Sequence, residues 1–519
     1  MLGRTHPRRW TDRLVAVSVA VASFVLVLKQ AQAETLNDAL SATYRSNARL
    51  DAARAALRAT DEEVARANSG FRPNVNATMD AGLQNQTTKS TTTTLATGVD
   101  TKVRGDFDTQ PYGYGMTASQ PLFRGFRTVN AVKEAEATVR AGRENLRSIE
   151  QAVLLDAITA YMDVLRDVAI VKIRESNVEV LTREWRATLE RLRVGEVTRT
   201  DGAQAEARRA GAVSALDLAR SNLKISRGSY ERHVGRPPAA LVEPRPPKNR
   251  LPRSIQDAIA ISSRENPIVI GALYREQGAS STVDRIWGEL LPTIQLDGTY
   301  NRRFDVSGSA TATTQTLVNE QQTASIVARA TIPLYTTGEV QARVRQAKHT
   351  HVSRIQEIEQ NRADVQALVV QTWSQLEAAQ AQLDSDNAQV KSLEIALGGV
   401  REEEKVGQRT LLDILNAEQE FLNAQVNLAA TRRNINVSSY AVLSAIGRLN
   451  IQELGATGEV YDAEVNYSDT RRKWWGVSII HSNGRREFVD FWDDLGRNFH
   501  GALGESVDSV PPAKSKAKR

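Results

Sequence analysis

The sequence predicts a mixed α and β membrane fold in which one unit of helices and strands occurs twice. Three observations carry this prediction. The chain repeats its own landmarks about 212 positions apart. Two long stretches lack proline and are rich in strong helix formers. Before each stretch lie short runs in which apolar and polar residues alternate, as they do in membrane strands.

The duplication is clearest at residues 193–201, Arg-Val-Gly-Glu-Val-Thr-Arg-Thr-Asp, which return at 405–413 as Lys-Val-Gly-Gln-Arg-Thr-Leu-Leu-Asp. Further landmarks match in pairs: Pro73 with Pro292, Pro121 with Pro333, and Gly235 with Gly447. The offset falls from 219 to 212 between Pro73 and Pro121, so the first copy is longer there, as a surface loop allows. We expect a first repeat at 34–244 and a second at 245–454.

The first 33 residues have the form of a secretion signal. Arginines precede an apolar run at 14–28, and Ala31-Gln32-Ala33 is an A-x-A cleavage site, so the mature chain is expected to begin at Glu34. The chain has no cysteine, which excludes disulfides and a lipid-acceptor cysteine. Removing the signal lowers the formal charge from +6 to about +2, with both signs mixed along the chain, and this argues against a nucleic-acid partner.

Two long helical hairpins are the main predicted helical elements. No proline lies between Pro121 and Pro237 or between Pro333 and Pro511. A continuous helix from about 128 to 192 would have ~65 residues and a length of ~100 Å, which no compact domain contains. Each long helix is interrupted once, at Val194-Gly195 and at Val406-Gly407, where glycine predicts a helix end.

A new helix is expected to begin just after each interruption. Thr198 is followed three residues later by Asp201, and Thr410 by Asp413, which is the spacing of a capping box. Each repeat therefore supplies a hairpin of two helices with a tight turn at its tip.

Four strands are predicted from period-two runs at 74–84, 112–119, 293–300 and 326–332. Each has about the ~10 residues of a transmembrane strand, within β-hairpins at about 73–122 and 292–334. The alternative is a pair of half-buried hairpins in a soluble domain, but the signal peptide and the fourfold occurrence favour the membrane. Residues 85–111 and 302–323 are expected to be long polar loops. Four strands cannot close a barrel, and an open edge is not viable in lipid, so several chains must share one.

At these motifs the sequence resembles the TolC family of outer-membrane efflux proteins. The resemblance rests on the duplication, on Pro-Leu-Phe-Arg-Gly at 121–125, on Pro-Leu-Tyr-Thr-Thr-Gly at 333–338, and above all on Val-Gly-Gln-Arg-Thr-Leu-Leu-Asp-Ile-Leu at 406–415. It implies a homotrimer with a twelve-stranded barrel in the outer membrane, four strands per chain, continued by a periplasmic α-helical coiled-coil barrel. Residues 455–519 are expected to form a periplasmic tail, partly disordered, that is similar to alphaproteobacterial members.

The resemblance also implies a function. It predicts the outer-membrane exit duct of a tripartite efflux pump or a type I secretion system, exporting small toxic compounds or proteins. Its partners would be a periplasmic adaptor (membrane fusion protein), an inner-membrane transporter of the RND or ABC type, and outer-membrane lipid. No enzymatic activity, cofactor or metal is implied. The alternative is a periplasmic coiled-coil adaptor or scaffold without a membrane barrel.

The resemblance assigns roles to residues at the tips. Asp413 would line the periplasmic entrance, and three such carboxylates around a threefold axis would raise one another's pKa and attract cations. Arg409 would bond to neighbouring helices through Thr200 and Asp201. Two positions depart from the family pattern, Asn416 and Glu404. The alternative is that the two aspartates only cap helices.

Two further sets of residues receive a predicted role. The tip turns, expected to dock the adaptor, are Val194, Gly195, Val406 and Gly407. The strand and helix junctions are Pro73, Pro121, Pro292 and Pro333.

Overall fold

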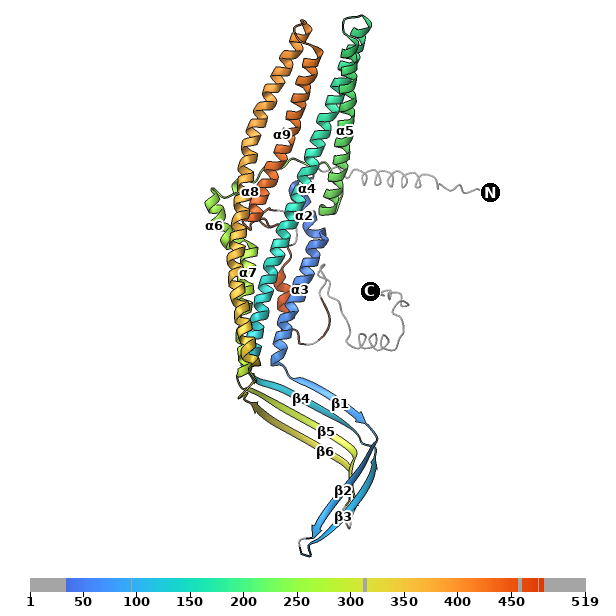
Figure 1. The fold of residues 1–519 in the computed structure, drawn as a ribbon, viewed down its shortest axis with the longest axis vertical. Helices are drawn as coiled ribbons and strands as arrows, with labels where there is room; N and C mark the ends of the chain where they lie inside the picture. Colours follow the sequence, from blue (N-terminus) through green and yellow to red (C-terminus); the bar gives the residue numbers. More distant parts are fainter. Residues whose placement is uncertain (1–33, 95, 311–314, 456–459, 475, 480–519) are drawn as a thin grey trace, which may run out of the picture. The chain divides into compact units, whose positions relative to one another are not determined.

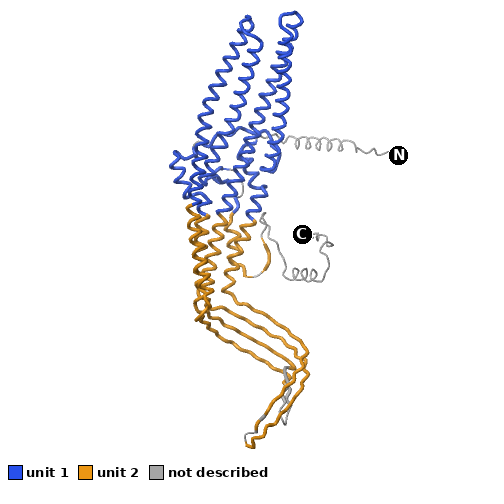
Figure 2. Tube along the Cα trace, in the orientation of Figure 1, with its two compact units in different colours: residues 1–54, 144–270, 360–461 blue, residues 55–143, 271–359, 462–519 orange. Residues whose placement is uncertain are grey.

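The computed structural model describes residues 34–479 except 95, 311–314, 456–459 and 475, so the predicted signal peptide and most of the predicted tail lie outside the described residues. The chain divides into two compact units, each built from three separate segments (Figure 2). Unit 1 comprises Met1–Arg54, Glu144–Ile270 and Gln360–Tyr461; unit 2 comprises Ala55–Arg143, Gly271–Glu359 and Asp462–Arg519.

The helices follow one another twice in the same order (Figure 1), with four strands between them in the first copy and two in the second. The first copy contains α2 (Leu36–Ser46), α3 (Ala48–Asn68), η1 (Ser69–Phe71), β1 (Asn74–Ala81), β2 (Gln84–Thr94), β3 (Val99–Thr109), β4 (Tyr112–Arg124), α4 (Arg127–Arg193) and α5 (Arg199–Val234). The second contains α6 (Ile255–Glu265), α7 (Pro267–Trp287), η3 (Gly288–Leu290), β5 (Thr293–Ala310), β6 (Gln315–Thr331), α8 (Glu339–Lys405) and α9 (Leu411–Ala445). A short η2 (Lys248–Arg250) lies between the copies, and α10 (Ala463–Arg472) follows the second.

The lengths of matching helices preserve the duplication. Both α2 and α6 have 11 residues, and both α3 and α7 have 21. Both α4 and α8 have 67 residues, which corresponds to ~100 Å at 1.5 Å per residue. The α4 helix extends over the range that the absence of proline predicted.

The four predicted strands pair in one antiparallel sheet of order β1-β4-β5-β6. Its register brings the alternating residues into two faces, because directly opposed residues point to the same side. One polar row joins Asn76, Thr117, Thr299 and Ser325 across the sheet. The opposite face collects apolar side chains from every strand: Val75, Ala77, Met79, Tyr114, Met116, Ala118, Leu296, Tyr300, Ile326 and Ala328. Met79 is 87% exposed, so this apolar face is not covered by the chain itself.

The prediction of two long polar loops is wrong. Residues 85–111 form most of the antiparallel pair β2–β3, and β5 and β6 continue their pairing as far as Ala310 opposite Gln315. The sequence of β2 is polar throughout, so it lacks the apolar alternation that signals a strand. Side-chain bonds between the two strands substitute for a buried face, as from Thr87 Oγ1 to Asp106 Oδ1 (2.8 Å).

The largest core lies in unit 1, where the short helices pack against the long ones. Leu154, Ile158 and Tyr161 on α4 are almost fully buried in it, as their spacing predicted. Tyr230 on α5 is fully buried beside Tyr161, with ring centroids 6.3 Å apart.

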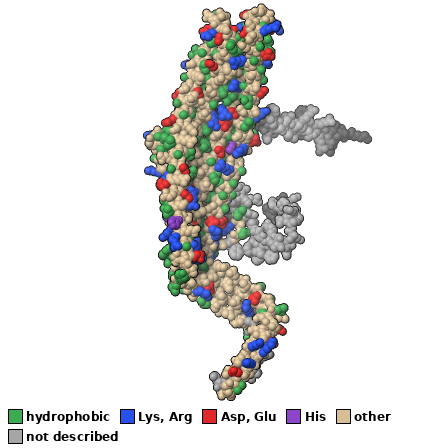
Figure 3. Space-filling view, in the orientation of Figure 1, with side chains coloured by type: hydrophobic (Ala, Val, Ile, Leu, Met, Phe, Trp, Pro, Cys, Tyr) green, Lys and Arg blue, Asp and Glu red, His purple; other side chains and the backbone are tan. Residues whose placement is uncertain are grey.

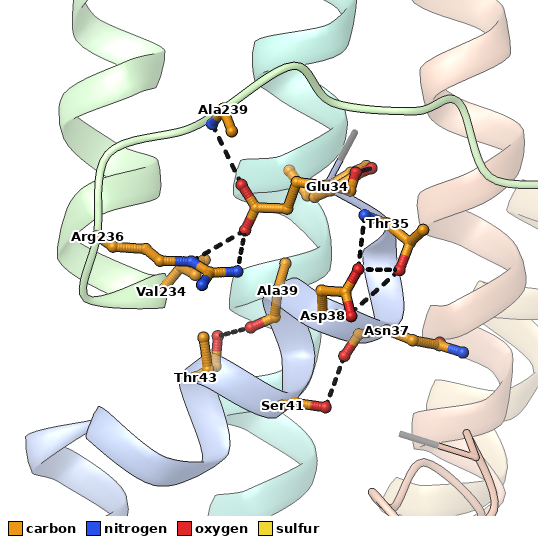
Figure 4. A network of polar contacts seen from close by, with 12 residues as sticks. Glu34, Thr35, Asn37, Asp38, Ala39, Ser41, Thr43, Val234, Arg236 and Ala239 are labelled. Atoms are coloured by element: carbon orange, nitrogen blue, oxygen red, sulfur yellow. Dashed lines mark hydrogen bonds and ion pairs between the residues drawn. The ribbon is translucent and has the colours of Figure 1, made fainter. Parts of the chain in front are cut away.

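The start of the described chain is fixed to this core by a buried carboxylate (Figure 4). Glu34 accepts hydrogen bonds from Arg236 Nη2 (2.7 Å), Tyr230 Oη (2.7 Å) and the Ala239 backbone nitrogen (3.2 Å). Burial raises the pKa of the Tyr161 hydroxyl to about 12, and this hydroxyl donates to the Val242 carbonyl at 2.6 Å. These contacts tie the first described residue to the loop after α5.

Each repeat also uses the arginine that follows its repeated glycine. Gly235 and Gly447 both have a left-handed φ, of 83° and 88°. Arg236 then binds Glu34, whereas Arg448 binds Glu265 through two bonds of 2.7 Å. The two copies therefore make the same kind of ion pair with carboxylates from different elements.

Candidate functional site

The two hairpin tips are tight turns of the same construction, both in unit 1. Gly195 has φ 80° and Gly407 has φ 78°, the left-handed conformation that glycine adopts without strain. In each turn the residue after the glycine donates its N–H to a carbonyl five residues back, as from Gln408 to Glu403 (2.9 Å). This geometry ends both long helices where the glycines predicted.

The preceding valines project from the turns into solvent. Val194 is 78% exposed and Val406 is 70% exposed. Exposed apolar side chains at the end of a long hairpin are available for contact with another protein.

Both predicted capping boxes are present. The hydroxyl of Thr198 accepts from the Asp201 N–H (3.3 Å), and the Asp201 carboxylate accepts from the Thr198 N–H (2.9 Å). Thr410 and Asp413 make the same pair of bonds, at 3.3 and 3.0 Å. Thr200 lies exposed in the first turn of α5, beside this box.

These bonds set the ionisation of the two aspartates within one chain. Hydrogen bonds from the Thr198 side chain and backbone lower the pKa of Asp201, and those from the Thr410 backbone and side chain lower the pKa of Asp413. The increase in the pKa of Asp413 that we predicted would come from carboxylates of neighbouring chains. It would oppose the lowering caused by Thr410.

Arg409 has a partner within its own hairpin. Its Nε donates to Glu403 Oε2 at 2.9 Å, and this bond raises the pKa of the guanidinium. Asp201 is engaged with Thr198 in the other hairpin. Within one chain, therefore, Arg409 is not paired with Asp201 or Thr200.

The two positions that depart from the family pattern join the hairpins to each other. Glu404 on α8 accepts from Arg191 Nη1 on α4 at 2.6 Å. Asn416 on α9 accepts from Arg208 Nη2 on α5 at 2.8 Å. Neither arginine was predicted from the sequence, because their partners lie 213 and 208 positions away. Only knowledge of which helix faces lie together would have found them.

The polar face of the sheet in unit 2 carries charged side chains. Ser119 Oγ donates to Asp297 Oδ1 (2.8 Å), and Arg303 lies 3.5 Å from Asp80. On the apolar face, the rings of Tyr112 and Phe304 stack with centroids 4.9 Å apart. The same face carries the ion pair of Arg302 and Glu320 (2.7 Å) beside Phe304, and charged side chains are visible over the strands in Figure 3. Around Ala77 and Met116 the face is apolar, which suits contact with lipid.

Three of the four junction prolines flank the strands of the sheet, and the fourth lies inside one. Pro73 precedes β1 and Pro292 precedes β5, while Pro333 follows β6. Pro121 lies within β4, where the pairing with β5 is irregular between Pro121 and Phe123. Proline has no N–H for a ladder bond, so these positions suit the ends and irregularities of strands.

None of the helices in residues 34–479, apart from the gaps given above, combines the length and the apolar character that spanning a membrane requires. The same residues contain no group of three or more His, Cys, Asp or Glu side chains that could hold a metal ion.

Comparison with known proteins identifies the class. The chain matches the family described as outer membrane efflux protein over residues 39–235 and 266–448. It is 36% identical over 464 residues to the outer membrane efflux protein BepC of Brucella suis, covering 89% of this chain and 96% of the relative. It is 24% identical over 323 residues to the outer membrane protein TolC of Escherichia coli, covering 61% and 66%.

Solved structures share the fold at low identity. The Campylobacter jejuni CmeC outer membrane channel aligns with a TM-score of 0.66 at 16% identity, covering 84% of this chain and 89% of that one. The outer membrane protein VceC of Vibrio cholerae aligns with a TM-score of 0.64 at 16% identity, covering 79% and 96%.

The fold and the sheet define a channel protein of the outer membrane, and the chain belongs to the outer membrane efflux protein family. The predicted mixed α and β fold is confirmed: the chain combines a four-stranded sheet with long helices, as the solved outer membrane channels do. The chain is an outer-membrane exit duct whose helical part lies in the periplasm.

Proposed function

We propose that β1 of one chain pairs with β6 of the next, so that three identical chains close the barrel. The sheet order β1-β4-β5-β6 leaves β1 and β6 as edge strands in the described part of the chain. Both edges carry exposed apolar side chains, among them Met79 and Ile326. Backbone groups at an open edge would be unsatisfied in lipid, and pairing between chains removes this cost. The observation that supports this pairing is that one sheet has both an exposed apolar face and two open edges.

Engineered cysteines test the pairing, because the chain has none of its own. Asn76 on β1 and Ser325 on β6 lie in the same polar row, on the two edge strands. Closing a barrel staggers the strands, so Asn76→Cys is combined in turn with Gln321→Cys, Thr323→Cys, Ser325→Cys, Arg329→Cys and Thr331→Cys, which share the polar face of β6. For one of these pairs in membranes, a short water-soluble thiol crosslinker should yield covalent trimers on a denaturing gel. The controls carry Thr117→Cys on the inner strand β4 in place of Asn76→Cys and should give monomers. Monomers from all the edge pairs would rule out the pairing.

We propose that the hairpin tips dock a periplasmic adaptor, which links the duct to an inner-membrane transporter of the RND or ABC type. The exposed Val194 and Val406 beside Gly195 and Gly407 support this surface. Relatives named for alkaline protease secretion in Pseudomonas aeruginosa and for protease secretion in Dickeya chrysanthemi support protein cargo. Those named for efflux support small toxic compounds. The duct itself is a passive channel without enzymatic activity.

Substitution of the tip valines tests the docking. Val194→Asp/Val406→Asp should abolish crosslinking to the adaptor and restore drug sensitivity in a strain that depends on this duct. Conductance in planar bilayers should stay unchanged, because the channel is intact. Normal adaptor crosslinking by this variant would place the docking surface elsewhere.

We propose that Asp413 forms a ring of three carboxylates at the periplasmic entrance, with Arg409, Thr200 and Asp201 in contacts between chains that keep it closed. The position of Asp413 in the first turn of α9, at the tip, supports this role. We also propose that residues 1–33 are a signal peptide, that 34–244 and 245–454 are the two repeats, and that 455–519 are a periplasmic tail.

A further inference from the structure

We infer that the segment after the second repeat builds a binding site for the phosphate headgroup of an anionic phospholipid, beside the start of β1. The site is a hollow of about 570 Å³ that lies entirely within unit 2. The end of α3, η1 and the residue before Pro73 form one wall, and α10 with Trp474 forms the other.

The hollow is preformed because α10 is fixed to α3 and α4. Asn466 Nδ2 donates to Asp61 Oδ2 on α3 at 2.6 Å. Arg143 on α4 pairs with Glu464 at 2.8 Å and lies over the ring of Tyr467, 5.0 Å from its centroid. Thr470 is buried. These contacts hold the second wall in place without any ligand.

The charge in the hollow suits an anion. Its charged lining residues are Arg72, Arg471, Arg472 and Glu464. The carboxylate is neutralised by Arg143, and Arg471 lies 3.5 Å from Glu136. Arg72 and Arg472 have no carboxylate partner among the residues that the structure describes. Two guanidinium groups therefore remain to bind phosphate oxygens.

Apolar side chains lie beside these charges. Trp474 is 71% exposed, and its ring carries the Arg72 guanidinium 4.6 Å from the centroid. Phe71 is 51% exposed on the opposite wall, and Val477 and Ile479 follow Trp474 with their side chains also exposed. Aromatic side chains next to basic ones are typical of the membrane interface, where the ring contacts lipid and the charge meets headgroups.

The position in the chain places the hollow at that interface. Arg72 and Pro73 lead directly into Asn74, the first residue of membrane strand β1. Gln120 on β4 donates to the Phe71 carbonyl at 2.9 Å, which ties η1 to the sheet. Since the helical part lies in the periplasm, the hollow faces the periplasmic leaflet of the outer membrane. A lipid headgroup fits this position better than a soluble phosphate, because Phe71 and Trp474 give the acyl chains an apolar contact.

Lipid binding by the purified full-length protein tests the inference. Native mass spectrometry would count the phosphatidylglycerol and phosphatidylcholine molecules that stay bound to the protein in detergent. The wild-type protein would be compared with Arg72→Gln/Arg472→Gln. Wild type should prefer phosphatidylglycerol. The double variant should bind it about 25-fold more weakly, since each basic residue near an anionic membrane surface contributes roughly fivefold. Phosphatidylcholine retention should fall less, because its choline cation offsets the charge of its phosphate.

Controls distinguish this site from general charge effects. Arg264→Gln removes an exposed arginine from α6 in unit 1 and should leave retention at the wild-type level. Trp474→Ala keeps all the charges and should weaken both lipids equally, so it tests the apolar contact even if the double variant folds poorly. Equal phosphatidylglycerol binding by wild type and the double variant would overturn the inference. Displacement of the lipid by inorganic phosphate would also overturn it, in favour of a soluble anion.

Discussion

Arg191 on α4 donates a hydrogen bond to Glu404 on α8 at 2.6 Å. This bond joins the two helical hairpins of one chain just below their tips. The hydrogen bond with Glu404 raises the pKa of Arg191. The Glu404 side chain is only 14% exposed, whereas that of Arg191 is 41% exposed. A second bond, from Arg208 to Asn416, joins the other helix of each hairpin. Separation of the hairpins would therefore break a charged link and a polar one.

Loss of the charged link should favour a wider entrance. For Arg191→Gln we expect an open-state population about two- to fivefold above wild type, because a partly exposed ion pair contributes ~0.5–1 kcal/mol. Single-channel recording in planar bilayers measures this directly. Glu404→Gln should act in the same direction, with a smaller effect because the amide can still accept a hydrogen bond.

Arg193→Gln is the matched control for this prediction. Arg193 lies two positions from Arg191, but among the described residues its ion pair is with Glu190 on its own helix, at 3.1 Å. Its loss should leave conductance unchanged. If Arg191→Gln and Arg193→Gln behave alike, the link between hairpins does not hold the closed state.

The two capping aspartates offer a matched test of the proposed entrance ring. Asp201 and Asp413 make the same bonds in the two tips, so substitution disturbs the helix start equally. Asp413→Asn should weaken block by a trivalent cation about tenfold or more, because only Asp413 is proposed to line the constriction. Asp201→Asn should raise conductance, because it weakens the proposed contacts between chains, but should weaken block much less than Asp413→Asn does. Equal effects of the two substitutions on block would favour helix caps over a ring.

Local signals in the sequence predicted the helices and strands of this fold, but they predicted the contacts between these elements less well. Gly195 and Thr198 fix a helix end and a helix start through bonds to residues within five positions, so their pattern is visible in a short window. The strand runs were predictable because one face must be apolar. By contrast, β2 has no apolar face, and its stabilising partners, such as Asp106 for Thr87, belong to another strand.

The contacts of the candidate site could not be predicted for the same reason, because they join residues that lie far apart in the sequence. Glu404 and Asn416 were singled out as departures from a family pattern, but their bonds depend on how two hairpins face each other. The hollow beside Arg72 depends on α10 returning to α3, a contact between residues 61 and 466 that no periodicity encodes.

Glu34 should contribute strongly to stability, because it satisfies buried donors. Glu34→Ala would leave the hydroxyl of the fully buried Tyr230 and the Arg236 guanidinium without their acceptor. We expect a loss of about 2–3 kcal/mol in the free energy of unfolding, measured by denaturant titration of the purified protein. Glu34→Gln retains an acceptor oxygen and should lose about half as much. An unchanged midpoint for Glu34→Ala would show that water replaces the carboxylate at no cost.

The attachment of α10 to α3 should depend on pH through Asp61. Burial raises the pKa of this carboxyl above its ordinary value of 3.8, against the hydrogen bond from Asn466. The charged groups around it are Arg143 on α4, Glu62 on α3 and Glu464 on α10. Because the folded pKa is raised, its protonation favours the folded state. That stabilisation is complete below the ordinary value and is lost as the pH rises through the raised one.

Hydrogen exchange of residues 463–472, corrected for the intrinsic rate at each pH, measures this dependence. In wild type we expect protection of α10 to increase as the pH falls from neutral toward 4. Asp61→Asn, which cannot ionise but keeps an acceptor for Asn466, should show nearly constant protection over the same range. Glu63→Gln on α3 serves as the control and should follow wild type, since the ion pair of Glu63 among the described residues is with Arg66 on the same helix. A wild-type profile that stays flat would mean that Asp61 does not titrate in this range and that Arg143 keeps it ionised.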